Sequence, residues 1–163
     1  MKEDDEINMF IVASNEQEIP ITVTHLSNSN DVDVVAVFNL DKIAINNFTK
    51  TFRENEKVYT EEDITLEHII DKCSLLKEEK DEVLVIIDYS KPLAEDEEIV
   101  GKELKQMSID LDIMLEIVIN VNGIIDNKNL MKYSNRILVK TPPPGILEIV
   151  VENGQIMKIN AKS

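Results

Sequence analysis

The hydrophobic pattern in the middle of the chain predicts a strand, a helix and a second strand that pack as one unit. Residues 83–87 are continuously apolar, which is typical of a strand covered on both faces, so we expect them at the centre of a sheet. Over residues 95–109 apolar side chains recur every three or four positions, as on a buried helical stripe, and residues 114–121 are again strand-like. This order predicts one βαβ unit with a right-handed crossover. A further helical stripe, over residues 61–80, is formed by Leu66, Ile69, Ile70, Cys73 and Leu76.

Shorter strand patterns occupy the amino-terminal part of the chain. Residues 7–12 and 32–38 are rich in β-branched side chains, and residues 19–23 alternate apolar and polar positions, as in a half-buried strand. Pro20 donates no backbone hydrogen bond, which places that strand at an edge. The three strands are expected to form a meander. The pattern over residues 41–59 fits a short helix and a hairpin equally well, and both alternatives stay open.

The carboxyl-terminal pattern predicts antiparallel pairing. Short strands are expected at residues 137–140, 146–151 and 156–159. Asn153 and Gly154 form the pair preferred in a type I′ turn, so the last two strands are expected to form a hairpin. The three prolines within residues 141–145 donate no backbone hydrogen bonds and therefore form a connector.

These elements predict an α/β (α+β) fold in a single domain over residues 1–163, with a mixed β-sheet, one βαβ unit, two main helices and a C-terminal antiparallel hairpin. A length of 163 residues, of which 43% are hydrophobic, suits one compact core. The acidic residues 1–6 are expected to form a tail. No apolar run approaches the roughly 18 residues of a membrane helix, so no membrane association is expected. The single cysteine, Cys73, cannot form an internal disulfide, which favours a cytoplasmic location.

Charge limits the kinds of partner that the chain is expected to bind. The formal net charge is −15, and most of the acidic excess lies within residues 54–116. Such a negative field repels phosphate backbones, so direct nucleic-acid binding is not expected. A basic protein surface is the expected partner, and the oligomeric state stays open.

Two acidic clusters are the candidate partner-binding residues. The first cluster is Glu61, Glu62 and Asp63, and the second is Glu95, Asp96, Glu97 and Glu98. Both fall where a helix is expected to begin, so they also fit a structural role in which carboxylates complement the helix dipole. In that interpretation Thr60 caps the first helix, and Ser90 with Pro92 begins the second. Capping accounts for only part of the acidic excess, which keeps the binding interpretation open.

Familiar catalytic motifs are missing from the sequence. Glycine occurs only at positions 101, 123, 145 and 154, which excludes nucleotide binding through a dinucleotide fingerprint or a Walker A loop. The two histidines, His25 and His68, supply few candidate bases for a catalytic triad and too few ligands for most zinc sites. We therefore expect no cofactor, and a protein that is not an enzyme is favoured.

One position has the geometry of a ligand site. Asp88 and Ser90 follow the central apolar strand, at the carboxyl end where open α/β sheets bind ligands. Asp88 is a candidate Mg²⁺ ligand because hard cations take oxygen donors. Its candidate companion is Asp33, Asp41 or Glu95. In the structural alternative, Asp88 ends the strand and Ser90 caps the next helix.

Charge and missing motifs lead to three functional hypotheses. The main one is a non-enzymatic acidic interaction protein, an inhibitor, immunity or accessory factor that binds a basic protein surface. The first alternative is an α/β enzyme or ligand-binding domain with carboxylates around a divalent cation. The second is a structural subunit that self-associates through an exposed strand edge.

Overall fold

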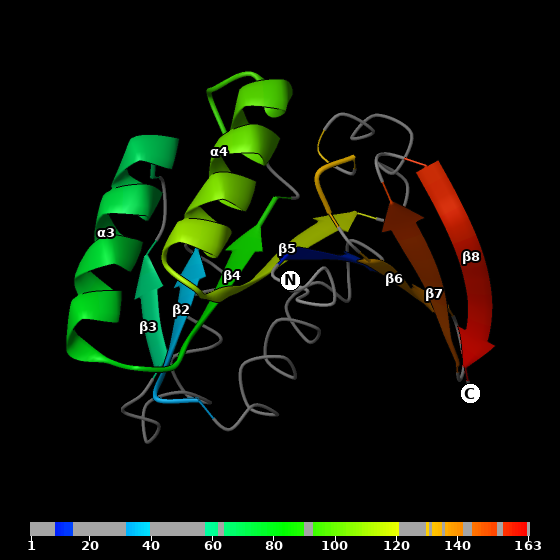
Figure 1. Ribbon diagram of the computed structural model, residues 1–163, viewed down its shortest axis with the longest axis horizontal. Helices are drawn as coiled ribbons and strands as arrows, with labels where there is room; N and C mark the ends of the chain where they lie inside the picture. The colour runs from blue at the N-terminus through cyan, green and yellow to red at the C-terminus, as the bar shows by residue number, and fades with distance from the viewer. Residues whose placement is uncertain are drawn as a thin grey trace.

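The computed structural model contains an eight-stranded sheet with the helices α3 (Leu66–Glu79) and α4 (Glu97–Asp110) on one face (Figure 1). It describes residues 9–14, 32–39, 58–61, 64–89, 93–120, 130, 132–134, 136–141, 145–152 and 155–162. The strands are β1 (Met9–Ser14), β2 (Val34–Phe38), β3 (Val58–Glu61), β4 (Val83–Asp88), β5 (Met114–Asn120), β6 (Arg136–Thr141), β7 (Gly145–Glu152) and β8 (Gln155–Lys162). Within these ranges no helix is long and apolar enough to cross a bilayer.

Most neighbouring strands of the sheet run parallel. The order is β3-β2-β4-β5-β1-β6-β7-β8, and every neighbouring pair from β3 to β6 is parallel. Strand β1 therefore lies between β5 and β6, although it is the first of the described strands in the sequence (Figure 1). Beyond β6 the pairing changes, since β6 with β7 and β7 with β8 are antiparallel. The parallel strands bring their carboxyl ends to one edge of the sheet.

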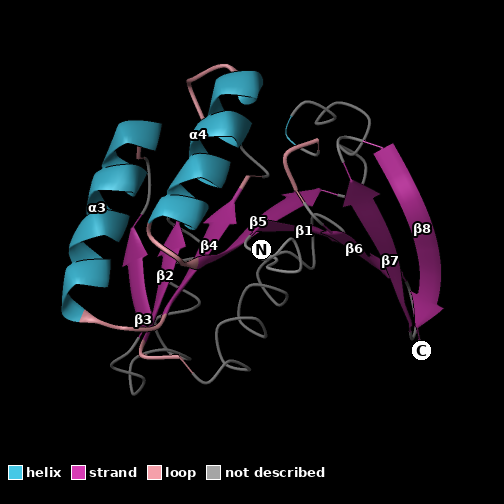
Figure 2. Cartoon of the chain, in the orientation of Figure 1, coloured by secondary structure: helices cyan, strands magenta, loops and turns pink. Residues whose placement is uncertain are grey.

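The interior strands form the core because both of their faces are apolar. All residues of β2 and β4 are buried. One face packs against α3 and α4 (Figure 2), and their buried side chains include Leu66, Ile69, Cys73, Val100 and Leu104. The other face is buried as well, through alternate residues such as Val35, Ile86 and Val118. Strand β4 is thus an interior strand, as its continuous apolar pattern predicts.

Helix α3 begins at Leu66, the first residue of its hydrophobic stripe, and not at residue 61, where the predicted range starts. Thr65 is the N-cap, and its hydroxyl accepts a hydrogen bond of 3.1 Å from the backbone N–H of His68. Thr60, the predicted cap, lies in β3 together with Glu61. The prediction that the first acidic cluster opens a helix is therefore wrong for Glu61, because this residue completes a strand that pairs with β2.

Helix α4 begins within the second acidic cluster, as predicted. Asp96 is the N-cap, and its Oδ1 accepts the backbone N–H of Glu98 at 2.8 Å. Glu97 and Glu98 occupy the first turn, where negative charge complements the helix dipole. The cap is Asp96 and not Ser90, which lies outside the described residues.

Gly101 allows an aromatic ring to approach α4. A Cβ at this position would lie 2.6 Å from Cδ2 of Tyr133, closer than packed carbon atoms come. Tyr133 belongs to the short segment before β6. The glycine therefore lets this segment pack directly on the helix.

The observed topology corrects the expected fold. The first and third predicted strands do not form a meander, because β1 pairs with β5 and β6 whereas β2 pairs with β3 and β4. The βαβ unit of β4, α4 and β5 is confirmed by the parallel pairing of its strands. Strands β7 and β8 pair antiparallel, but they only extend a large parallel sheet at one side. A fold class defined by one βαβ unit and a C-terminal antiparallel hairpin is therefore wrong.

Several sequence predictions fall outside the described residues. They concern the tail at residues 1–6, the strand at 19–23, the open segment at 41–59 except its last two residues, which begin β3, the prolines 142–144 of the connector and the turn at 153–154.

Candidate functional site

Two polar residues meet at the carboxyl edge of the sheet, where β2 and β4 end. Asp88 is the last residue of β4 and is 6% exposed. Asn39 follows β2 with a φ of 69°, a conformation that Asn adopts more readily than most residues. Its Nδ2 donates a hydrogen bond of 3.0 Å to the backbone carbonyl oxygen of Asp88. The two strand ends are thus held together at the edge where open α/β sheets bind ligands.

The ends of β2 and β4, with Asn39 and Asp88, form a corner of the site, and Tyr89 connects this corner to β5 and to α4. Its backbone N–H donates to the carbonyl oxygen of Val118 at 2.8 Å, and its side chain is buried. Burial is the main reason why the pKa of Tyr89 rises to about 12, and nearby carboxylates add to the effect. These carboxylates are, in decreasing order, Glu97, Asp96 and Glu95. The phenol therefore stays protonated at neutral pH beside the acidic start of α4.

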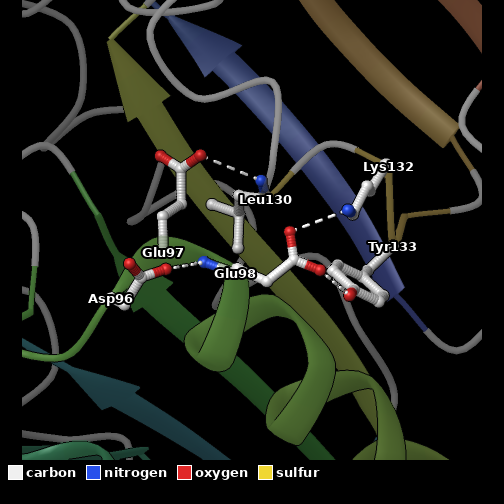
Figure 3. Close-up of polar contacts among 6 residues, drawn as sticks. All are labelled: Asp96, Glu97, Glu98, Leu130, Lys132 and Tyr133. Carbon is white, nitrogen blue, oxygen red and sulfur yellow. Dashed lines mark hydrogen bonds and ion pairs between the residues drawn. The ribbon is translucent and has the colours of Figure 1, made fainter.

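The first turn of α4 also binds the segment that precedes β6 (Figure 3). Glu97 Oε1 accepts the backbone N–H of Leu130 at 3.1 Å. Glu98 Oε1 lies 2.7 Å from Nζ of Lys132, and Glu98 Oε2 accepts a hydrogen bond from the hydroxyl of Tyr133. The contact with Lys132, followed by that with Tyr133, lowers the pKa of Glu98 because both stabilise the carboxylate. These two acidic side chains therefore have partners within the chain.

The predicted partner-binding residues lie at the carboxyl edge of the sheet wherever the structure describes them. Glu61 ends β3 at this edge, and the start of α4 brings the second acidic cluster to it. Glu62 and Asp63 lie outside the described residues. Oε1 of Glu95 is buried without a hydrogen-bond partner in the described ranges. A partner-binding role for these acids stays a prediction.

Of the alternative companions of Asp88, Glu95 lies near the same edge of the sheet and Asp33 does not. Asp33 lies at the opposite edge of the sheet, where its Oδ2 accepts the backbone N–H of Glu82 at 3.0 Å. Asp41 lies outside the described residues, and Glu95 is near the corner, just before α4. Among the described side chains, no group of three or more His, Cys, Asp or Glu is placed to hold a metal ion. Asp88 thus offers one carboxylate and not a complete metal cage.

Sequence reasoning missed several residues of this region. Asn39 follows a strand without any motif, and the contact between Tyr133 and Glu98 spans 35 positions that no local pattern connects. Glu116 had a visible signal, because it is the only charged residue in the apolar run at 114–121. Its side chain is buried within β5.

Solved structures share this fold, whereas the sequence matches no protein family model and no curated protein. A KaiC-like protein from the hyperthermophilic archaeon Pyrococcus horikoshii OT3 is similar with a TM-score of 0.60 and 8% identity, over 94% of this chain and 84% of that chain. The assembled ATPase EscN, from the type III secretion system of enteropathogenic E. coli, is similar with a TM-score of 0.55 and 10% identity. That similarity covers 83% of this chain and 42% of EscN.

The similarity to these structures contradicts the expected fold class and the main functional hypothesis, and it favours the first alternative function. The chain is an α/β domain with the fold of a KaiC-like protein and of an ATPase, so the expected α+β fold closed by a hairpin is wrong. The hypothesis of a non-enzymatic acidic inhibitor, immunity or accessory factor is wrong for the same reason. The alternative of an α/β enzyme or ligand-binding domain agrees better with this fold. At these identities the similarity shows the fold alone.

Proposed function

We propose that this domain binds a phosphorylated small molecule, first of all a nucleotide, together with a divalent cation at the carboxyl edge of its parallel sheet. The observation that carries the proposal is the position of Asp88, which ends a buried interior strand of a fold also found in an ATPase. Open α/β sheets bind their ligands at this edge.

The donor groups at the corner fit a hard cation. Mg²⁺ prefers oxygen ligands and is usually held by one or two carboxylates, several waters and the phosphates of a substrate. One carboxylate from Asp88, without a complete protein cage, matches that pattern. The cation would neutralise the phosphates, which the acidic groups around this edge otherwise repel.

The proposal concerns binding and not hydrolysis. P-loop enzymes hold the transferred phosphoryl group with the backbone and lysine of a Walker A loop. This sequence has four glycines, at 101, 123, 145 and 154, and none of them has Walker A spacing. We therefore expect no release of phosphate from ATP above the level of a protein-free control. A cytoplasmic location, favoured by the buried Cys73 thiol, belongs to the same proposal.

Thermal unfolding with separate ligands tests the proposal. The full chain is heated with Mg²⁺ alone, ATP alone, ADP alone, each nucleotide with Mg²⁺, and adenosine with Mg²⁺. Saturating Mg²⁺-nucleotide is expected to raise Tm by about 5 °C or more, because a ligand at about 100 times its Kd adds about 3 kcal/mol. Adenosine is expected to have no effect.

The variant Asp88→Asn is expected to lose the part of the increase that depends on Mg²⁺. Asp71→Asn, at an exposed position of α3, removes the same charge and should keep the full increase. Wild-type protein that gains no stability from any nucleotide at millimolar Mg²⁺ would contradict the proposal. An equal loss in both variants would show that net charge, and not Asp88, determines the effect.

A further inference from the structure

A buried carboxyl lies within the sheet, on the strand next to the one that Asp88 ends. Glu116 belongs to β5 and is 7% exposed. The strand register places it beside Ile86 of β4 and Phe10 of β1. Its Oε1 is buried and has no hydrogen-bond partner among the residues that the structure describes. Most buried polar atoms in folded proteins do have such a partner, so this position is unusual.

The described surroundings of Glu116 are almost entirely apolar. Side chains alternate along a strand, so its neighbours on the same face of the sheet follow from the register. They are Leu84, Ile86 and Asp88 of β4, Phe10 and Val12 of β1, and Met114 and Val118 of β5. Asp88 is the only titratable group among them, and it lies two residues nearer to the carboxyl edge than Ile86, the residue beside Glu116.

Burial makes the ionised form of Glu116 unfavourable. A carboxylate that loses its water and gains no partner is destabilised, whereas the neutral acid tolerates an apolar environment. This burial raises the pKa of Glu116 from 4.5 to about 7. Near neutral pH the side chain therefore changes between its neutral and ionised forms, while an exposed Glu is ionised throughout.

We propose that Glu116 is a pH-sensitive switch in the centre of the sheet. The strands around Glu116 pack most tightly while its carboxyl is protonated, and their packing loosens when the carboxyl ionises. The carbonyl oxygen of Val118, on the same strand, accepts the backbone N–H of Tyr89 at 2.8 Å. Water drawn towards an ionised Glu116 would weaken the packing of β5 next to this hydrogen bond. The proposal about Glu116 does not depend on the proposed ligand binding at the carboxyl edge of the sheet.

The direction of the pH effect follows from proton linkage. Between the unfolded and the folded pKa, the folded chain holds more protons on Glu116 than the unfolded chain does. The free energy of unfolding therefore falls as the pH rises through this window, and this contribution becomes constant above it. The stabilisation is complete at a pH below the unfolded pKa.

Urea unfolding of the full chain from about pH 5 to about pH 9 tests the switch. Glu116→Gln keeps the shape of the side chain and removes its titration, and Glu103→Gln is the matched control at an exposed position of α4. Across this range, the folded-to-unfolded ratio of Glu116→Gln relative to wild type is expected to rise on the order of 100-fold. Glu103→Gln is expected to follow wild type.

Two results of this experiment would overturn the switch. The first is a Glu116→Gln variant with the same pH dependence as wild type. The second is a pH dependence that disappears in Asp88→Asn and remains in Glu116→Gln, because the titrating group would then be Asp88.

A measurement on wild-type protein covers the case in which Glu116→Gln does not fold. Carbon-13 NMR of labelled Glu carboxyls is expected to show one carboxyl with a midpoint of about 7. The protection of the Tyr89 amide against hydrogen exchange, corrected for the intrinsic rate, is expected to fall across the same midpoint. The proposal would be contradicted if the titration midpoints of all the Glu carboxyls lay in the ordinary range of Glu.

Discussion

The start of α4 shows how single residues connect distant parts of the chain. Glu98 joins Lys132 and Tyr133, and the ring of Tyr133 lies against Gly101, one helical turn further along. The Nζ atom of Lys132 also lies 5.3 Å from the centre of the Tyr133 ring. Exposed ion pairs contribute little to stability, so this arrangement orients the segment before β6 more than it stabilises the fold.

Gly101→Ala is expected to destabilise the protein by about 1 kcal/mol, even though Ala favours a helix interior over Gly by a similar amount. The new Cβ would lie 2.6 Å from the Tyr133 ring and would displace it. In a Tyr133→Ala background the same change is expected to be stabilising. Urea unfolding of the four proteins measures this coupling. An equal effect in both backgrounds would show that the ring does not restrict position 101.

Both helices begin directly after a capping residue. The stripe of α3 starts at Leu66, the residue after the N-cap Thr65, whereas Glu61, at the start of the predicted helical range, belongs to β3. In α4 the acidic cluster contains the cap itself. Polar residues at the start of a helix therefore set its first turn, while apolar residues set the face that it buries.

Thr65→Ala is expected to lower the free energy of unfolding by about 1 kcal/mol and to reduce the protection of the His68 amide, because this N–H loses its acceptor. Thr65→Ser keeps the hydroxyl, so the free energy of unfolding and the protection of the His68 amide are both expected to stay at their wild-type levels. Thr60→Ala is the informative comparison, since Thr60 lies in β3. A loss of His68 protection in Thr60→Ala would contradict the assignment of Thr65 as the cap.

The sequence predicted individual elements better than it predicted their neighbours. The apolar run of β4 correctly indicated an interior strand, because burial leaves a continuous apolar signal. Strand β1 has a similar pattern, yet nothing local indicates that it pairs with β5 and β6. The site follows the same rule: Asp88 was predictable from its place at the end of the apolar run of β4, whereas Asn39 and Tyr133 come near the carboxyl edge only through the tertiary fold.

At the scale of the whole molecule, the excess of acidic groups acts on the same edge as the proposed ligand site. The net charge is −15, and the second acidic cluster lies beside the corner of Asp88 and Tyr89. This field repels a free phosphorylated ligand. A divalent cation reverses the local sign, which is why ligand binding is expected to require one.

Cys73 reports on the integrity of the whole core. It is the only cysteine, it is fully buried on the face of α3 that packs on the sheet, and burial raises its pKa to about 12. Labelling by a thiol reagent at neutral pH is expected to be slow and to increase with urea as the core opens. A Cys73→Ala and Leu75→Cys double variant places the thiol at an exposed position of the same helix and should react rapidly. Equal labelling rates in the native state would show that α3 separates readily from the sheet.

The place of β1 has a consequence for how the chain is made. Met9 pairs with Leu115 and Phe10 pairs with Arg136, so β1 leaves the ribosome more than a hundred residues before either strand with which it pairs. Closing such long loops costs entropy before any contact forms, which slows folding. During synthesis, the pairing of β1 within the sheet must therefore await both β5 and β6.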